Sequence, residues 1–345
     1  MSVIPKTSQD VAQLIDANLD RAREGLRVIE DWSRFGLNNK AFVIILKDWR
    51  QQLGRQHNEF YKKARSTSTD KGAGLKHPAQ STRSQPKEIV AANFARVQEA
   101  LRVLEEFTRT THPELSRISA DIRYKIYDLE IDILKASNHK IRLEILNSCK
   151  LCLITRPHPQ LRKTVSLALK AGVRMIQFRC KEGTDSENLG LAKKIASSCK
   201  SHNSLFIIND RIDIAIASNA DGIHLGQEDI PIKIARELVG PEKIIGLSTH
   251  SVKQIESAEK EPCDYLGVGP IYKTPSKPNE KSIGTDFIKK VANQINIPWF
   301  AIGGINKVNI SEINRLGARK IALINAIMSA EDPYTASKEL LEKIK

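Results

Sequence analysis

The second half of the chain alternates regularly between short apolar runs and helical patterns, and this alternation limits the fold more than any other feature. From about Lys150, eight runs rich in β-branched and other apolar residues recur within 196 residues, with helical patterns between them. Strands that alternate with helices form parallel sheets, and eight repeats predict a compact (β/α)8 TIM barrel. The eight runs are 151–155, 173–179, 205–209, 220–225, 243–248, 264–269, 298–303 and 320–324.

The first 140 residues have a different character, because they show helical periodicity and contain an internal repeat. The segment "ANLDRAREGLRVIED" (17–31) aligns without gaps with "ANFARVQEALRVLEE" (92–106). In each copy the apolar residues fall three and four positions apart, which is typical of one face of a helix. The repeat therefore predicts two similar helices that bury equivalent faces.

A second helical pattern follows each copy and carries an Asp-x-Arg triplet, which begins at Asp48 in the first copy and at Asp121 in the second. Each copy is thus predicted to be an αα-hairpin. We expect an all-α helical domain, a duplicated αα-hairpin, over 1–140, followed by the α/β barrel domain over 141–345. Between the copies, segment 62–87 holds seven Lys or Arg residues and is rich in Ser, Thr and Gly, which predicts a mobile basic loop.

The polar residues that repeat on the first helix of each hairpin allow two interpretations. Two such sets could meet across a pseudo-twofold axis and line a pocket. Alternatively, they belong to a duplicated packing surface on which glutamates pair with arginines three residues later, as Glu24 would with Arg27. We favour the packing surface, and the sequence names no ligand for this domain. The two sets are Asn18, Arg21 and Glu24, and Asn93, Arg96 and Glu99.

Composition narrows the class of protein. The longest apolar run, Ala41 to Leu46, is too short to cross a bilayer, and "MSVIPKTSQD" does not resemble a secretory signal, so a cytoplasmic protein is expected. Five scattered cysteines do not form a disulfide framework. The net charge of +14 indicates an acidic partner, but an aromatic content of 5% makes nucleic acid an unfavoured one. A homo-oligomer is compatible with the sequence, which does not specify one.

Polar side chains stand at the predicted carboxyl ends of the barrel strands, where TIM barrels build their active sites. Each of them alone has a structural explanation, such as helix capping or a tight turn. Together, they gather cations, carboxylates, hydroxyls and a Gly-Gly turn on one rim. In chain order these residues are Gln177, Arg179, Lys181, Asn209, Asp210, Asp229, Ser248, Thr274, Ser276, Lys277, Gly303, Gly304 and Asn325.

This rim predicts two anion sites. Carboxylates at Asp210 and Asp229, placed among Lys and Arg residues, suggest a hard divalent cation such as Mg²⁺ that binds with phosphate oxygens. The Gly303-Gly304 turn stands where such barrels bind phosphate through backbone N–H groups. We therefore expect either two phosphorylated substrates or one substrate with phosphates at both ends.

Two histidines are the candidate proton carriers of the rim. His224 and His250 follow or end predicted strands, but neither is paired in sequence with a Ser or Cys nucleophile, so covalent catalysis has no support. His224 could equally be a hydrogen-bonded core histidine, which we favour slightly.

Five motifs, in consistent order and spacing, resemble those of the thiamine-phosphate synthase family. The resemblance covers 150–345, and a longer form of the family with an N-terminal extension is similar to the arrangement in this chain. The motifs are "QFRCK" (177–181), Asn209 to Arg211, "DGIHLGQED" (221–229), "DYLGVGPIYKTPSK" (264–277) and "AIGGI" (301–305).

The resemblance implies a reaction in which hydroxymethylpyrimidine diphosphate condenses with thiazole phosphate, or its carboxylated form, to give thiamine phosphate and diphosphate. Mg²⁺ is the implied cofactor, held by Asp210 and Asp229. The implied catalytic residues are Arg179, Lys181, Ser248 and Lys277. Those implied to bind the pyrimidine diphosphate are Gln177, Phe178, Arg179, Cys180, Lys181, Asn209, Ser248 and Lys277, and those for the thiazole phosphate are Thr274, Ser276, Gly304 and Asn325.

Strand alternation qualifies two of these assignments, since it turns Phe178 and Cys180 to the side opposite the cations. For Cys180, packing is the simpler explanation. The chain also departs from the family pattern at two positions. Ser276 stands where Thr is more usual and keeps the hydroxyl. Asn325 stands where Ser is expected, and this departure leaves the last contact to the thiazole phosphate open.

The chemistry of the rim agrees with this reaction, because diphosphate leaves from a carbon whose cation the electron-rich pyrimidine stabilises. Catalysis then needs neutralised charge and a positioned thiazole nitrogen, which already has a lone pair and requires no general base.

Three other functions stay open. The first is a thiazole tautomerase on the same barrel, which has no use for the full set of cations and paired aspartates. The second is a sugar-phosphate isomerase, which can act without Mg²⁺. The third is an RNA- or regulator-binding module, which would use the helical domain and its basic loop.

Overall fold

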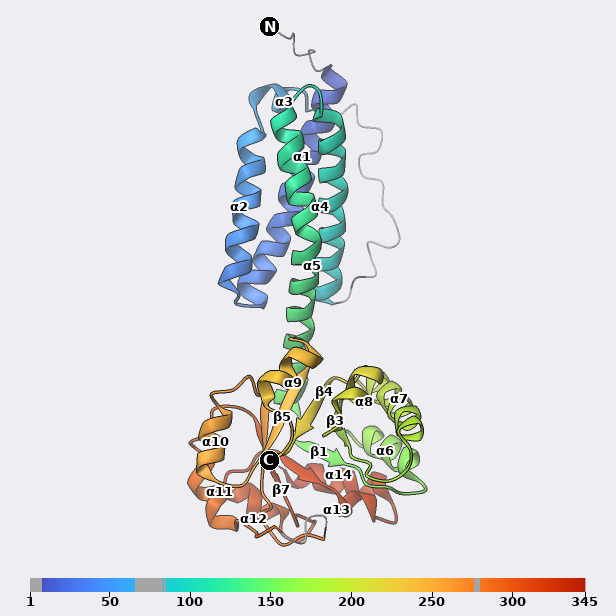
Figure 1. Cartoon of the computed structure of the whole chain (residues 1–345). Helices are drawn as coiled ribbons and strands as arrows, with labels where there is room; N and C mark the ends of the chain where they lie inside the picture. Colours follow the sequence, from blue (N-terminus) through green and yellow to red (C-terminus); the bar gives the residue numbers. More distant parts are fainter. Residues whose placement is uncertain (1–7, 66–82, 84, 276–279, 345) are drawn as a thin grey trace. The chain divides into compact units, whose positions relative to one another are not determined.

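The computed structural model describes residues 8–65, 83, 85–275 and 280–344. The chain divides into two compact units, residues 1–138 and 139–345, and the division falls within one long helix (Figure 1). Most of the predicted basic loop lies outside the described residues, as do Ser276 and Lys277. Within the described ranges, no helix combines the length and the apolar character needed to cross a membrane.

The helical unit consists of two hairpins, as the repeat predicts. Helices α1 and α4 pack against each other, and Gly25 allows the approach, since a Cβ atom there would lie 2.6 Å from Val97 Cγ2. Buried leucines, isoleucines and Phe94 fill the core between the helices. The elements are α1 (Gln9–Asp31), the π-helix η1 (Trp32–Gly36), α2 (Lys40–Gln56), α3 (Glu59–Lys63), α4 (Pro86–Thr108) and α5 (Pro113–Ser148), the last of which continues into the second unit.

The buried polar residues of the repeat stabilise the helical unit, whereas Arg21, Glu24, Arg96 and Glu99 are exposed. In both copies the asparagine side chain donates within its own helix, Asn18 to Leu14 O at 2.9 Å and Asn93 to Ile89 O at 2.8 Å. A buried glutamate of each first helix also accepts from an arginine of the second helix, at the same distance of 2.9 Å in both copies. The two pairs are Glu30 with Arg50, and Glu105 with Arg123.

The expected pairing of glutamates with arginines three residues later is wrong in direction. Arg27 pairs with residues on its C-terminal side, Glu30 at 3.5 Å and Asp31 at 3.0 Å. Its counterpart Arg102 does the same with Glu105 and Glu106. These later carboxylates are also three and four residues away, so the helix satisfies the spacing rule with a different partner.

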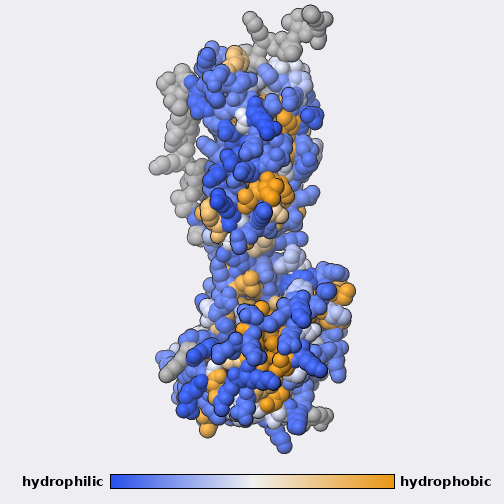
Figure 2. All heavy atoms as spheres, turned by 90° about the vertical axis from the view of Figure 1, so that its left-hand side faces the viewer, coloured by the Kyte–Doolittle hydropathy of each residue, from blue (hydrophilic) through white to orange (hydrophobic). Residues whose placement is uncertain are grey.

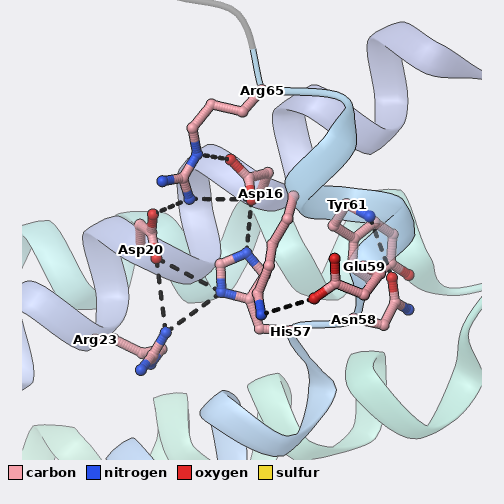
Figure 3. Close-up of polar contacts among 9 residues, drawn as sticks. Asp16, Asp20, Arg23, His57, Asn58, Glu59, Tyr61 and Arg65 are labelled. Carbon is pink, nitrogen blue, oxygen red and sulfur yellow. Dashed lines mark hydrogen bonds and ion pairs between the residues drawn. The ribbon is translucent and has the colours of Figure 1, made fainter.

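One polar cluster belongs to a single copy of the repeat (Figure 3). His57 Nε2 lies 2.6 Å from the buried Asp16 carboxylate, which also accepts from Arg65 Nε at 2.7 Å. Asp20 and Arg23 complete the cluster on the other side of the imidazole ring. The second copy has alanines at the positions of the two aspartates, Ala91 and Ala95. The cluster is therefore not a requirement of the hairpin fold, and its charges largely neutralise one another.

The second unit is a closed barrel of eight parallel strands in sequential order, which confirms the predicted TIM barrel. Each predicted run overlaps one observed strand, and only β5 extends past the end of its run, by the single residue Thr249. The strands are β1 (Leu151–Ile154), β2 (Met175–Phe178), β3 (Leu205–Asn209), β4 (Gly222–Leu225), β5 (Ile244–Thr249), β6 (Tyr265–Val268), β7 (Trp299–Ile302) and β8 (Ile321–Leu323).

Strand alternation separates two cores in this unit. Side chains such as Leu153 and Ile176 point outward and pack under the surrounding helices, whereas Met175, Tyr265 and Phe300 fill the inside of the barrel. The helices are α6 (Leu161–Lys170), α7 (Asp185–Ser201), α8 (Ile212–Ala217), α9 (Ile232–Val239), α10 (Val252–Ala258), α11 (Thr285–Val291), α12 (Ile310–Arg315), α13 (Asn325–Met328) and α14 (Pro333–Lys343).

The surface is mostly hydrophilic on the side seen in Figure 2, with scattered apolar groups. Exposed large apolar residues of the helical unit include Phe35, Ile44, Tyr124 and Ile131. Single exposed apolar side chains are common in folded proteins, so these residues identify no partner by themselves.

Candidate active site

Two adjoining cavities lie at the carboxyl ends of the barrel strands. Their volumes are about 330 Å³ and about 1050 Å³. The smaller is lined by Gln177, Thr274, Gly304 and Asn325, and the larger by Lys181, Asp210 and Asp229. The residues that line both are Arg179, Asn209, His224, Ser248, His250 and Glu280. Thr274, Gly304 and Asn325, which are expected for thiazole phosphate, thus line a different cavity from the two aspartates expected for Mg²⁺. The two cavities share Arg179 and Ser248.

The end of β2 is fixed by hydrogen bonds to β1. Thr155 donates its backbone N–H to Gln177 O at 2.8 Å, and its Oγ1 accepts from Arg179 N at 3.0 Å. Gln177 is buried, whereas Lys181 is exposed. These two hydrogen bonds fix the backbone at Arg179. The Arg179 side chain, which lines both cavities, therefore extends from a fixed backbone position.

Phe178 and Cys180 lie apart from these cavities. Phe178 packs in the outer core beside Phe206, with ring centroids 6.3 Å apart. The Cys180 thiol donates to Glu182 O at 3.3 Å. Neither side chain is among the described residues that line the cavities, so we leave both out of the proposed binding set. The alternation of the strand is the physical reason.

Asp210 and Asp229 form the acidic part of the larger cavity. Asp210 follows β3 with a φ of 62°, and its N–H donates to His224 O at 2.9 Å. The Asp229 carboxylate accepts from Gly226 N at 2.6 Å. Burial and the nearby Asp229 carboxylate raise the pKa of Asp210, although Lys181 and Arg179 act in the opposite direction. Two neighbouring carboxylates, one of them disfavoured as an anion, are stabilised by a shared proton or by a cation.

The protein supplies only part of the set of oxygen ligands that Mg²⁺ requires. Across the described ranges, no group of three or more His, Cys, Asp or Glu side chains could hold a metal ion. Mg²⁺ is commonly held by one or two carboxylates together with substrate phosphates and water. Asp210 and Asp229 meet that requirement if a diphosphate supplies further oxygens.

Ser248 and His224 lie between the two cavities. The His224 Nε2 atom is 2.9 Å from Ser248 Oγ, and its Nδ1 atom is 3.0 Å from the hydroxyl of Tyr265 on β6. The imidazole is buried, with 7% of its surface exposed, and both nitrogens are hydrogen-bonded. The interpretation of His224 as a hydrogen-bonded core histidine is confirmed, although the same ring also lines the cavities.

The far end of the smaller cavity is formed by the turns after β7 and β8. Gly303 and Gly304 have φ values of 98° and 66°, and a Cβ on Gly304 would lie 2.6 Å from Tyr272 Cβ. A side chain at Gly304 would therefore be both strained and crowded. Asn325 Oδ1 accepts from Arg156 Nε at 3.2 Å, and Arg156 also donates to Ser329 Oγ at 3.0 Å.

Several residues near the site do not stand out in the sequence. Glu280 lines both cavities, and Lys273 lines the smaller one. Both belong to the long loop after β6. Their position in a loop at the carboxyl end of a strand was the only indication in the sequence that they lie near the site. Arg156 follows β1, the one strand end that contributes no residue to the predicted rim. Tyr265 begins a strand, and nothing in the linear sequence indicates that its ring extends toward His224.

Two family models match different parts of the chain. The family model described as thiamine monophosphate synthase matches residues 151–327. A second model, described as the ThiD2 family, matches residues 13–132 in the helical unit. Among solved structures, thiamine phosphate pyrophosphorylase from Pyrococcus furiosus is similar with a TM-score of 0.54 and 37% identity, over 58% of this chain and 97% of that chain.

Curated relatives match along the whole chain. A thiamine-phosphate synthase from a strain of Prochlorococcus marinus is 64% identical over 345 residues and covers 100% of both chains. A thiamine-phosphate synthase from a strain of Synechococcus is 50% identical over 99% of this chain and 98% of its own. With the barrel, its rim and full-length relatives in agreement, the chain belongs to the thiamine-phosphate synthase family, a family of transferases in thiamine biosynthesis.

Proposed function

We propose that this enzyme joins hydroxymethylpyrimidine diphosphate to thiazole phosphate, with release of diphosphate and formation of thiamine phosphate. The observation that carries the proposal is the pair of adjoining cavities, one with cations and carboxylates and the other with a Gly-Gly turn. A diphosphate fits the first cavity, and a monophosphate fits the second. Gln177, Asn209 and Ser248 lie where the pyrimidine would bridge them.

The residues of the larger cavity are proposed to act on the leaving group. Arg179 and Lys181 hold the diphosphate and offset the negative charge that grows as the carbon–oxygen bond breaks. Lys277, which lies outside the described residues, is assigned to the same task by its motif. Charge stabilisation of this kind suits a dissociative displacement in which no base removes a proton.

Asp210 and Asp229 are the residues proposed to hold Mg²⁺. When bound, Mg²⁺ would supply further charge neutralisation to the diphosphate oxygens. The raised pKa of Asp210 supports this assignment, because a cation would remove the cost of keeping two neighbouring carboxylates ionised.

The smaller cavity is proposed to take the thiazole phosphate. Gly304 leaves space for close backbone approach, and Thr274 and Asn325 add side-chain donors. Ser276 is assigned by its motif alone. The thiazole nitrogen would then face the pyrimidine carbon from a fixed position. This fixed orientation of the two reacting atoms would increase the rate.

A thiazole tautomerase is the second candidate, and the geometry at His224 speaks against it. A histidine that moves a proton to and from a ligand needs a ring nitrogen directed at that ligand. Both nitrogens of His224 are engaged by Ser248 and Tyr265. We further propose phosphorylated small molecules, not nucleic acid, as the partners and the cytoplasm as the location.

The test is a direct synthesis assay with the full chain. Purified protein is mixed with both phosphorylated precursors, with and without Mg²⁺, and thiamine phosphate and diphosphate are quantified. We expect both products in equal amounts and only with Mg²⁺ present. Absence of thiamine phosphate under all conditions refutes the function, and equal turnover after removal of Mg²⁺ by a chelator refutes the metal assignment. Parallel reactions with thiazole phosphate and its carboxylated form identify the second substrate.

A further inference from the structure

A chain of buried polar side chains crosses four strands inside the barrel and ends at Ser248. Tyr265 on β6 contacts His224 on β4 at 3.0 Å, and His224 contacts Ser248 on β5 at 2.9 Å. The Gln177 side chain on β2 lies near enough to Tyr265 to lower the pKa of its hydroxyl, against the larger effect of burial. Tyr265, His224 and Gln177 are 2%, 7% and 3% exposed. Buried polar groups are normally satisfied, so this chain is an ordered network and not a chance contact.

Strand register explains how the tyrosine reaches the histidine. His224 pairs with Gly246 of β5, and Gly246 pairs in turn with Tyr265. A Cβ on Gly246 would lie 2.1 Å from the Tyr265 ring, so the ring occupies the space that a side chain on β5 would otherwise fill. Gly246 thus allows a residue of β6 to contact a residue two strands away.

The hydrogen bonds of this network have a preferred donor-to-acceptor direction, from Tyr265 through His224 to Ser248. The Tyr265 hydroxyl stays protonated near neutral pH, since burial raises its pKa well above the usual range. If this hydroxyl donates to Nδ1 of neutral His224, the imidazole proton lies on Nε2 and is donated to Ser248 Oγ. The hydroxyl hydrogen of Ser248 is then left for the cavities that Ser248 lines.

We propose that Tyr265 is a positioning residue that acts through His224 to direct the Ser248 hydroxyl hydrogen at the departing diphosphate. The inference rests on the proposed function for the identity of that ligand. No proton is transferred: the carbon–oxygen bond breaks, its electron pair stays on the diphosphate, and Ser248 donates a hydrogen bond to the oxygen that gains charge. In the opposite arrangement, with the proton on Nδ1, Ser248 would donate to His224 and lose this role.

The test combines histidine tautomers with kinetics in the full chain. Protein labelled with ¹⁵N in histidine is compared as wild type and as Tyr265→Phe, with His224→Gln used to assign the His224 signals. We expect the Nε2–H tautomer in the wild type and a mixture in Tyr265→Phe. The same substitution should lower kcat about tenfold, the equivalent of one hydrogen bond, with little change in the KM for the pyrimidine diphosphate.

The control is Tyr61→Phe, which removes a hydroxyl from a tyrosine that is 1% exposed in the helical unit and should leave both readouts unchanged. An Nδ1–H tautomer in the wild type overturns the proposal, even if Tyr265→Phe does not fold. A fall in kcat without a tautomer change overturns it too, as does a tautomer change without a fall in kcat. If the wild type makes no thiamine phosphate, the proposed function fails, while the tautomer measurement still decides the direction of the network.

Discussion

The carboxyl groups of Asp210 and Asp229 contact the same cavity although they follow different strands, and burial together with the Asp229 charge raises the pKa of Asp210. Such a pair is stabilised by a shared proton, or by a cation in its place. When both groups are ionised, the two carboxylates therefore repel each other in the larger cavity. This repulsion is consistent with a site that binds a cation together with its substrate.

Asp210→Asn should consequently separate activity from stability. Loss of one proposed ligand is expected to lower kcat by about 100-fold or more, in the range seen when one electrostatic contact is removed. The same change should raise the melting temperature of the metal-free protein at neutral pH. The folded-state pKa of Asp210 is raised, so its charge destabilises the fold at high pH and ceases to do so as the pH falls through that value.

The measurements are steady-state kinetics across Mg²⁺ concentrations and thermal unfolding at several pH values. Asp128→Asn is the matched control, since this carboxylate is exposed on α5. A variant that keeps wild-type turnover and an unchanged Mg²⁺ requirement would remove Asp210 from the metal site.

Lys181→Ala tests whether Lys181 binds the diphosphate leaving group. Lys181 is exposed and lines the larger cavity, so its removal should leave the melting temperature unchanged. We expect kcat/KM for the pyrimidine diphosphate to fall by about 100- to 1000-fold, because a charge that stabilises the transition state is lost. Lys200→Ala, at the end of α7, is a control of equal charge change. Near-normal turnover of Lys181→Ala would contradict the proposed role.

The barrel and the composition of its rim were predictable, because both depend on local sequence. Eight apolar runs set the strands, and parallel strands bring all their carboxyl ends to one rim. Side chains such as Asp210 and Asp229 could then be grouped before any coordinates were known. Alternation likewise indicated that Cys180 points away from the cations, and the thiol does lie outside the cavities.

Contacts between distant residues could not be predicted in this way. Tyr265 reaches His224 only because Gly246 lies between them in register, and register across three strands is not visible in the linear sequence. The partners of Arg27 were misassigned for a related reason. Carboxylates stand on both sides of it at helical spacing, and its observed partner Glu30 also pairs with Arg50 of α2.

Arg156 offers a test of the thiazole phosphate end. It holds Asn325 Oδ1 at 3.2 Å, which leaves the amide nitrogen of Asn325 as the group available to a ligand in the smaller cavity. Arg156→Ala should therefore raise the KM for thiazole phosphate about tenfold, the equivalent of one hydrogen bond, with a smaller effect on kcat. The measurement is a double-mutant cycle with Asn325→Ala.

In that cycle the effect of Arg156→Ala should largely disappear when Asn325 is already alanine, because the two residues act through one contact. Arg162→Ala removes an exposed arginine from α6 and serves as the control. Additive effects of the two substitutions would show that Arg156 acts independently of Asn325.

Asp16 is expected to control the acid stability of the helical unit. Burial alone would raise the pKa of Asp16, but hydrogen bonds and charge from Arg65 and His57 outweigh it and hold the pKa below its ordinary value of 3.8. A carboxylate with a lowered folded-state pKa stabilises the fold at higher pH, and this contribution is lost as the pH falls through that lowered value. Asp16→Asn should therefore cost about 1–3 kcal/mol at neutral pH, as expected for hydrogen bonds to a charged group, and much less in acid.

Urea unfolding of the full chain, with amide hydrogen exchange in α1 and α2, measures this difference and locates it. Glu59→Gln removes an exposed carboxylate beside the same cluster, with 75% of its side chain exposed, and should change stability little at either pH. Because the second copy of the repeat has Ala91 at the position of Asp16, exchange in α4 should respond only through unfolding of the core that it shares with α1. An equal loss of stability at neutral and acid pH would show that Asp16 contributes through packing and not through its charge.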